Sequence, residues 1–197
     1  MELPGPEALP HLRTERLTVR MADEMDVPAI VRYYVENRDH LRPFDPRRPA
    51  AFYDEEFWYA QVRQNVVDYY SDQALRLFLF AHDDPDGVIG IANFTNIVRG
   101  AAHFCNLGYS VAAASEGQGY MFEALRAAIA FVFGALRIHR IQANYMPHNL
   151  RSGKLLQRLG FVEEGLARDY LLIDGRWRDH VLTSLTNPEW RPVTISD

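Results

Sequence analysis

A glycine-bearing loop is the segment of this sequence best suited to bind an anion. It reads Glu116-Gly117-Gln118-Gly119-Tyr120-Met121 and follows the strand-like run Leu107-Gly108-Tyr109-Ser110-Val111. Glycines let main-chain N–H groups approach a ligand without interference from a Cβ atom, and a helix that begins here adds partial positive charge. The loop lacks the third glycine of the dinucleotide fingerprint, and the chain has no Gly-Lys-Ser/Thr. The pattern therefore predicts phosphate binding by main-chain groups, without a lysine.

A second polar segment follows the next predicted strand and reads Tyr145-Met146-Pro147-His148-Asn149-Leu150-Arg151-Ser152. Asn149 is a good N-cap for a short helix, and Gly160 followed by Phe161 is typical of a Schellman C-terminus. Local structure does not explain why the polar residues Asn149 and Ser152 come directly after the strand. We expect both side chains to contact a bound ligand.

Hydrophobic periodicity indicates the elements that hold these two segments. Helices are predicted from Asp23, over 54–70, from Met121 and over 149–159. Strands are predicted over 17–20, 75–81, 88–98, 103–111, 137–145, 161–173 and 176–186, with hairpin turns at 84–87 and at Asp174-Gly175. The order is β-α-α-β-β-β-α-β-α-β-β, without repeats. We predict a single α/β domain with a mixed, largely antiparallel central sheet flanked by helices.

Composition excludes several classes of protein. The chain has 197 residues with 26 acidic and 21 basic side chains, which give a net charge of -5. This negative charge argues against a protein whose main function is to bind the phosphate backbone of a nucleic acid. Its one cysteine, Cys105, excludes an intramolecular disulfide and is expected as a buried core thiol, and no histidine spacing fits a metal. No signal peptide and no apolar span of about 20 residues is evident. We expect no nucleic acid, membrane or metal partner, and a cytoplasmic location.

Together the two polar segments resemble the GCN5-related N-acetyltransferase superfamily. In that family a Gln/Arg-x-x-Gly-x-Gly/Ala loop holds the pyrophosphate of acetyl-CoA, and an Asn-x-x-Ser…Gly-Phe segment follows. Glu116 and Met121 depart from the loop pattern. Because the loop binds through main-chain groups, both changes are tolerable if Glu116 points away from the phosphates. The resemblance implies acetyl-CoA as cosubstrate, bound by Tyr109, Ser110, Val111, Gly117, Gln118, Gly119, Tyr120, Met121 and Asn149.

Three longer motifs resemble the ribosomal-protein alanine N-acetyltransferase subfamily: residues 93–100, 145–149 and 169–180. Pro4, Gly5, Pro6 and Pro10 predict a flexible tail over 1–12, and the resemblance implies an acetyltransferase domain over 13–190, followed by a C-terminal tail over 191–197. Within these motifs, Asn93, Tyr145 and Tyr170 are the expected acceptor-binding positions, and the aromatic residues Tyr34 and Phe44 near the first helix are added to them.

The implied reaction is direct acetyl transfer to a neutral amine, without an acyl-enzyme. Ser152 is the candidate proton donor to the departing thiolate, and its alternative role is an ordinary residue of a helix first turn. Asp169, acting through water, is the candidate base, and its alternative is a surface aspartate. Many relatives carry Glu at a central-strand position that holds Asn106 here, which excludes a base at that position.

Aromatic and acidic residues near the first helix leave two interpretations open. Tyr33, Tyr34 and Phe44 either wall a peptide groove or pack in the core. Acidic residues of the same region either attract a basic peptide or form a solvated face; they are Glu36, Asp39 and Asp45.

The leading hypothesis is acetylation of the N-terminal α-amine of an alanine on a basic ribosomal protein. Within the enzyme class the alternative acceptor is a small amine such as a polyamine, an amino acid or an aminoglycoside, because one superfold hosts many functions. From another class, the alternative is a CoA-binding ribosome-assembly module with little turnover. Both a monomer and a homodimer are compatible with the sequence.

Overall fold

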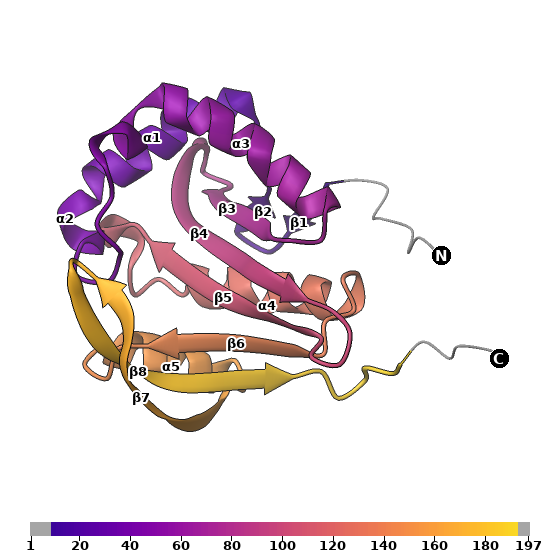
Figure 1. Ribbon diagram of the computed structural model, residues 1–197. Coiled ribbons are helices and arrows are strands. Elements are labelled where there is room, and N and C mark those ends of the chain that lie inside the picture. Colours follow the sequence, from indigo (N-terminus) through magenta and orange to yellow (C-terminus); the bar gives the residue numbers. More distant parts are fainter. Residues whose placement is uncertain (1–8, 193–197) are drawn as a thin grey trace.

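The computed structural model describes residues 9–192, which form an eight-stranded sheet with helices on both faces (Figure 1). The strand order is β1-β2-β3-β4-β5-β6-β8-β7. The strands are β1 His11–Arg13, β2 Leu17–Arg20, β3 Leu75–Ala81, β4 Asp84–Val98, β5 Phe104–Val111, β6 Arg140–Tyr145, β7 Val162–Ile173 and β8 Arg176–Thr186. The helices are α1 Val27–Glu36, α2 Arg38–Leu41, α3 Glu55–Tyr70, α4 Tyr120–Gly134 and α5 Leu150–Arg158, with 3-10 turns at Glu24–Asp26, Ala50–Tyr53 and Ala113–Ser115.

The predicted fold class is confirmed. Within the described residues, β5 and β6 are the one parallel pair of neighbours, and every other pair is antiparallel. The predicted Asp174-Gly175 hairpin joins β7 to β8, and both residues have positive φ, 43° and 75°, as a type I′ turn requires. The short helix α2 and the 3-10 turns were not predicted, because segments of three or four residues carry too little periodicity.

The N-terminal boundary of the domain differs from the predicted one. His11 and Leu12, expected in the tail, belong to β1 because they pair with Arg20 and Val19 of β2. The remainder of the predicted tails, residues 1–8 and 193–197, lies outside the described residues.

The first hairpin turn also lies elsewhere than predicted. The chain turns at His82-Asp83, and β4 already begins at Asp84, which pairs with Ala81. The next pair is Phe80 with Val88, so residues 85–87 bulge out of the ladder. Pro85 has no N–H to donate to a neighbouring strand, and a bulge is where a sheet accepts it.

The strand β3 is buried on both faces because its side chains alternate between two hydrophobic clusters. Leu75, Leu77 and Leu79 face the cluster that includes α4 and α5, whereas Phe78 and Phe80 face the cluster that includes α1 and α3. The sheet is therefore covered by two helices on each face.

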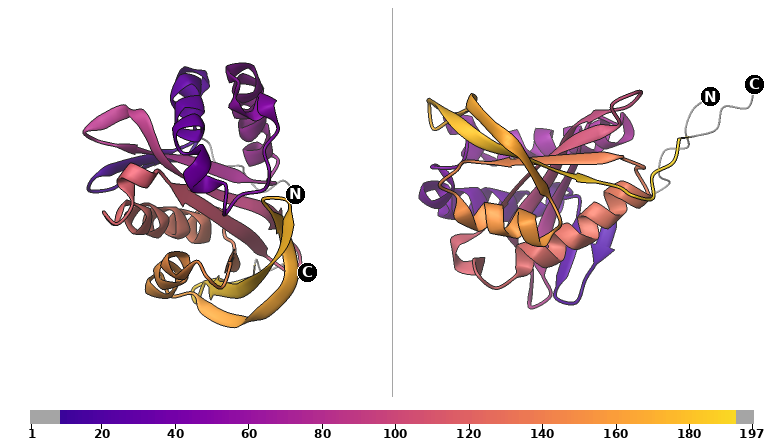
Figure 2. Two further views of the ribbon diagram at one scale, coloured as in Figure 1. Left: turned by 90° about the vertical axis from the view of Figure 1, so that its left-hand side faces the viewer. Right: turned by 90° about the horizontal axis from the view of Figure 1, so that it is seen from below.

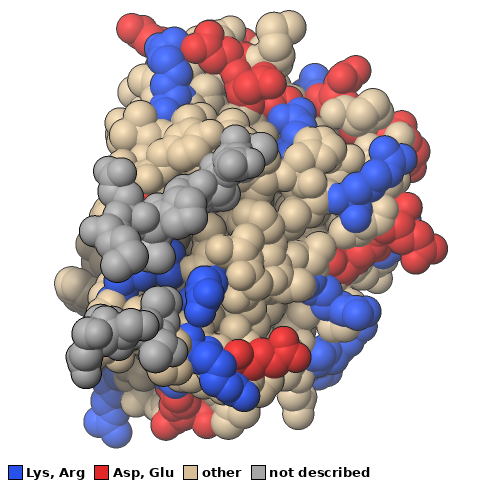
Figure 3. Space-filling model, turned by 90° about the vertical axis from the view of Figure 1, so that its right-hand side faces the viewer, with Lys and Arg blue, Asp and Glu red and all other residues tan. Residues whose placement is uncertain are grey.

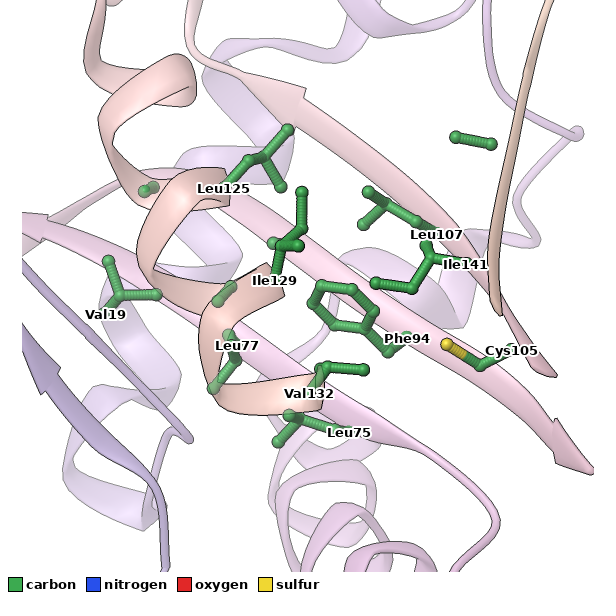
Figure 4. Close-up of a cluster of buried hydrophobic side chains, with 14 of the residues drawn as sticks. Val19, Leu75, Leu77, Phe94, Cys105, Leu107, Leu125, Ile129, Val132 and Ile141 are labelled. Atoms are coloured by element: carbon green, nitrogen blue, oxygen red, sulfur yellow. The ribbon is translucent and has the colours of Figure 1, made fainter. Parts of the chain in front are cut away.

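The predicted apolar stripe of α4 packs on the first of these clusters. Leu125, Ile129 and Val132 lie over the side chains of the central strands (Figure 4). Cys105 of β5 is fully buried there, so the expectation of a buried core thiol is confirmed, and burial raises the pKa of its thiol to about 12.

The two parallel strands separate after a short paired stretch. Phe104–Asn106 pairs with Arg140–Gln142, after which β5 continues beside β4 and β6 continues beside β8. The carboxyl ends of β5 and β6 therefore diverge, on the left of Figure 1 and toward the viewer in the left view of Figure 2. Ligands of open α/β sheets bind at the carboxyl ends of strands, and this divergence places the candidate site.

The opposite side of the molecule carries charges of both signs. Figure 3 shows this face, where Lys and Arg side chains alternate with Asp and Glu around an uncharged area. None of the helices within residues 9–192 has the length and apolar character needed to cross a membrane. Nor does this part of the chain bring three or more His, Cys, Asp or Glu side chains together as metal ligands do.

Candidate functional site

A hydrogen bond between two hydroxyl groups spans the diverging strands. The Tyr109 hydroxyl on β5 lies 2.8 Å from Oγ of Ser152 in the first turn of α5. Burial raises the pKa of Tyr109 to about 12, more than the bond to Ser152 lowers it. The Tyr109 hydroxyl therefore carries its proton at neutral pH. The structure thus brings the predicted proton donor into contact with a predicted coenzyme residue, and no sequence signal linked the two.

The loop before α4 presents a row of main-chain donors. Gly117 and Gly119 have φ of 73° and 82°, a conformation that favours glycine. Within the described residues, the N–H groups of residues 117–122 donate to no acceptor. Because α4 begins at Tyr120, these groups lie at the positive end of its dipole. The arrangement suits a phosphate or pyrophosphate, as the sequence predicts.

An ionic cluster that the sequence analysis missed holds this loop in place. Glu123 of α4 accepts hydrogen bonds from Thr14 Oγ1 at 2.6 Å, from the Arg16 main-chain N–H at 2.8 Å and from Arg16 Nε at 2.7 Å. Arg16 Nη1 also donates to the carbonyl of Gln118 at 2.9 Å, and its guanidinium lies 4.5 Å from the centre of the Tyr120 ring. These contacts join residues more than 100 positions apart, which no local pattern indicates.

The charge of Glu123 makes this cluster dependent on pH. Burial opposes ionisation of Glu123, but the hydrogen bonds from Thr14 and Arg16 outweigh it and hold its pKa below the ordinary 4.5. A depressed folded-state pKa gives stability that is complete above the unfolded-state pKa and is lost as the pH falls through the folded-state value. We expect Glu123→Gln to lower the free energy of unfolding by about 1–3 kcal/mol at pH 7, and by less at pH 3.

Urea unfolding of both proteins at the two pH values measures this difference. The matched control is Glu24→Gln, because Glu24 forms an exposed ion pair with Arg63 and should contribute little at either pH. An equal loss for Glu123→Gln at pH 7 and pH 3 would show that packing, not charge, accounts for the effect.

The two residues that depart from the family loop pattern both point away from the donor row. Glu116 forms ion pairs with Arg151 of α5 and, at 3.6 Å, with His40 of α2. The side chain of Met121 is buried in the core. Gln118 uses its amide within the loop, donating to the carbonyl of Ala114 at 2.9 Å.

The first turn of α5 is built as the sequence predicts. Asn149 Oδ1 accepts a hydrogen bond from the Ser152 N–H at 3.2 Å, so the asparagine is the N-cap. At the other end, the N–H groups of Gly160 and Phe161 donate to the carbonyls of Gln157 and Leu156, which is the predicted Schellman arrangement.

A close contact fixes the helix against β6. A Cβ atom at Gly153 would lie 2.8 Å from the Tyr145 ring, so glycine is needed there for α5 to approach the strand. This explains the position of Tyr145, a predicted acceptor residue, beneath the turn that carries Ser152.

The remaining predicted acceptor residues lie at different depths. Tyr34 is buried and stacks on Trp58 with ring centres 5.1 Å apart. Phe44 is 40% exposed, and its ring lies 6.3 Å from that of His148. Asn93 is half-buried on β4, opposite Gly108 of β5. The Tyr170 hydroxyl on β7 accepts a 3.4 Å hydrogen bond from Asn144 at the end of β6.

Other contacts tie the first helix to the site. The Tyr33 hydroxyl lies 2.8 Å from Ser110 Oγ, and buried Asn37 accepts a hydrogen bond from the Ala113 N–H at 2.8 Å. Val111 ends β5 opposite Gly90 of β4. Helix α1 is thereby fixed to both the strand and the loop that carry predicted coenzyme residues.

The predicted base lies on an irregular part of β7. Asp169 is exposed, has φ of 46° and receives no hydrogen bond on its carboxylate from any described residue. Its N–H donates to the Asp179 carboxylate at 2.9 Å. Asp169 precedes Tyr170 in the chain and forms no hydrogen bond with Tyr109 or Ser152.

The three acidic residues near the first helix differ in their surroundings, since Glu36 and Asp39 are exposed and Asp45 is not. Asp45, one of the acidic residues expected to attract a basic peptide, is paired with Arg48 at 3.3 Å. Burial raises the pKa of Asp45 more than Arg48 lowers it. The surrounding pocket, described below, is rich in arginine.

Known proteins are similar to this chain over most of its length. Residues 16–162 match the acetyltransferase (GNAT) domain. The chain is 50% identical over 183 residues to the ribosomal protein uS5-alanine N-acetyltransferase of Escherichia coli strain K12, covering 92% of this chain and 93% of that protein.

Solved structures agree with these sequence matches. The ribosomal-protein-S5-alanine acetyltransferase of Vibrio fischeri superposes with a TM-score of 0.89 at 36% identity, covering 93% of this chain and 100% of that one. Mycobacterium smegmatis RimJ in complex with CoA-disulfide superposes with a TM-score of 0.82 at 28% identity, covering 92% and 88%.

Proposed function

The chain belongs to the GNAT acetyltransferase family and is an acetyl-CoA-dependent N-acetyltransferase, and we propose that its acceptor is the N-terminal alanine of ribosomal protein uS5. The observation that carries this proposal is the 50% identity to the Escherichia coli enzyme over 92% of the chain. The acceptor proposal thus adds a substrate to an activity that the family already establishes.

The residues present fit acetyl-CoA. The unpaired N–H groups of residues 117–122 suit its pyrophosphate, and the edge of β5 after Asn106, from which β6 has diverged, leaves main-chain groups for its amides. We propose that Tyr109, Ser110 and Val111 provide this edge. The bound coenzyme supplies an acetyl group already activated as a thioester.

The proposed mechanism is direct attack by the neutral amine on the thioester carbonyl. As the new C–N bond forms and the thioester C–S bond breaks, Ser152 passes its proton to the departing thiolate, whose thiol has a pKa of roughly 8.5, and takes a proton back from water; Tyr109 holds Ser152 in place for that transfer. An α-amine with a pKa near 8 is about one-tenth neutral at pH 7, so it needs little help from a base. Asp169 is the proposed acceptor of the amine proton, through water.

The acceptor is tested by competition between amines. The enzyme receives acetyl-CoA with a peptide of the uS5 N-terminus starting with Ala, an N-blocked copy containing Lys, spermidine and an aminoglycoside. Because a lysine pKa near 10.4 leaves roughly 200-fold less neutral amine than an α-amine, we expect the free alanine peptide to react about two orders of magnitude faster than the blocked peptide. Mass spectrometry locates the acetyl group.

Two outcomes would contradict the proposal. Faster acetylation of spermidine, the aminoglycoside or the blocked peptide would make this a small-amine or lysine acetyltransferase. Binding of acetyl-CoA without release of thiol to any acceptor would favour a CoA-binding assembly module.

The net charge of -5 supports a basic ribosomal protein as the partner, because opposite charges steer two molecules together at a distance. Added salt should then slow association with the whole ribosomal protein. We propose a cytoplasmic location, since ribosomal proteins and acetyl-CoA meet there.

A further inference from the structure

A pocket of about 330 Å³ opens between α2, the loop that follows it and the β7–β8 turn. We call it the arginine pocket. Its charged lining consists of Arg38, Arg42, Arg47, Arg48, Asp45 and Asp174. Four arginines and two aspartates give this pocket an excess of two positive charges, although the whole chain is acidic.

The two aspartates neutralise only part of this charge. Asp45 pairs with Arg48 at 3.3 Å, and Asp174 pairs with Arg47 at 3.5 Å and more loosely with Arg42 at 4.0 Å. Arg38 forms no ion pair with any residue in the range 9–192, and its guanidinium lies over the Tyr53 ring, 4.8 Å from the centre. Arg38 and Arg42 are therefore available to an anion that enters the pocket.

The arginine pocket lies beside the site of acetyl transfer. Phe44, within the loop after α2, stacks near His148, which directly precedes the N-cap of α5. On the other side, His40 of α2 contacts Glu116 of the coenzyme loop at 3.6 Å. The Asp174 N–H donates to the Asp45 carbonyl at 3.0 Å, which closes the pocket against the hairpin turn.

The contacts of Phe44 with His148 and of His40 with Glu116 place the arginine pocket on a path open to a peptide whose first amine reaches Ser152. An extended chain advances about 3.3–3.6 Å per residue, so side chains a few positions after the alanine come within reach of the pocket. The planar fork of a guanidinium matches a carboxylate with two parallel hydrogen bonds.

Resting on the acceptor proposed above, we propose that the arginine pocket binds the carboxylate side chain of an acidic residue within the first residues of the acceptor peptide, through Arg38 and Arg42. The overall acidic charge of the enzyme then attracts a basic protein at long range, while this pocket selects a local acidic residue near its N-terminus.

The test uses peptides that begin with Ala and carry one Glu at position 2, 3, 4 or 5, each paired with a copy that has Gln there. At one position we expect Glu→Gln to lower kcat/KM by about ten- to a hundredfold, because the charged hydrogen bonds are lost. Arg38→Gln should bring the ratio of kcat/KM for the Glu peptide to kcat/KM for the Gln peptide close to one. Arg42→Gln should act in the same direction.

The matched control is Arg63→Gln, since Arg63 is an exposed arginine on α3 outside the pocket, and it should keep the full preference for Glu. The inference is supported if Arg38→Gln and Arg42→Gln lose the preference for the Glu peptide while the KM for acetyl-CoA is unchanged in all variants.

Three results would overturn the inference. Equal rates for Glu and Gln peptides at every position would do so while leaving N-terminal acetylation, and hence the proposed function, intact. A raised KM for acetyl-CoA in Arg38→Gln, with the peptide preference retained, would assign the pocket to a phosphate of the coenzyme. If no alanine peptide is acetylated, the proposed function fails and the inference fails with it.

Discussion

Replacing Ser152 by alanine is expected to lower kcat by about 10²- to 10⁴-fold while the Kd for acetyl-CoA stays close to that of the wild type. The Ser152 hydroxyl lies 2.8 Å from that of Tyr109, which is protonated at neutral pH because burial raises its pKa to about 12. A proton given to the thiolate as it departs stabilises the transition state and not the bound substrate. The helix should persist, since Asn149 caps the main-chain N–H of Ser152 and not its side chain.

Tyr109→Phe tests whether the two hydroxyls act as a unit. If Tyr109 positions Ser152, the single variants and the double variant should show similar losses in kcat, because residues of one unit are not additive. Tyr70→Phe is the control, since Tyr70 is 54% exposed at the end of α3.

Steady-state kinetics measures kcat of each variant, and calorimetric titration measures its Kd for acetyl-CoA. A wild-type kcat in Ser152→Ala would leave Ser152 with a purely structural role. A weakened Kd with unchanged kcat would assign the hydroxyl to coenzyme binding.

Acetyl-CoA at a hundredfold excess over its Kd is expected to stabilise the wild-type fold by about 2.7 kcal/mol, which raises Tm by about 5–10 °C in a domain of this size. Gly117→Asp should remove most of this shift. Gly117 has φ of 73°, which Asp tolerates better than most residues, and a Cβ atom there meets nothing within 4 Å. The new carboxylate would lie beside the N–H groups proposed to hold the pyrophosphate, and like charges repel.

Gly117→Asn is the matched control, because it has the same shape and backbone preference without the charge. We expect it to keep most of the Tm shift, and both variants should melt near the wild type without ligand. A full shift in Gly117→Asp would exclude the loop at 117–119 from the pyrophosphate site.

Gly119→Pro is unsuitable for this test, although from sequence alone Gly119 lies near the start of a helix, where the first turn tolerates proline. Its φ of 82° is incompatible with proline, which is fixed near about -65°. That variant would lose stability whether or not the coenzyme binds here.

Elements with long or strict patterns were predictable from the sequence. The stripe of α4, the alternation of β3 and the Asp174-Gly175 turn each depend on neighbours in the chain, so local chemistry specifies them. The N-cap at Asn149 and the Schellman end at Gly160 follow for the same reason. The two segments expected to bind the coenzyme, the loop before α4 and the first turn of α5, were found in this way.

Elements that depend on distant partners were not predictable. β1 forms because His11 and Leu12 pair with β2. β4 begins before its predicted start because Asp84 pairs with Ala81, with a bulge after it. Segments as short as these contain too few residues for a hydrophobic pattern to indicate a strand.

What only the tertiary structure decided is which side chains meet. Tyr109 and Ser152 are 43 residues apart, and they meet because β5 and β6 diverge after three paired residues. Glu123 and Arg16 are 107 residues apart, and Asp174 approaches Arg42 and Arg47 only when the hairpin folds over α2. Sequence patterns record the local preferences of the backbone and the burial of each face. Hydrogen bonds and ion pairs across the fold depend on the placement of whole elements, which no local pattern contains.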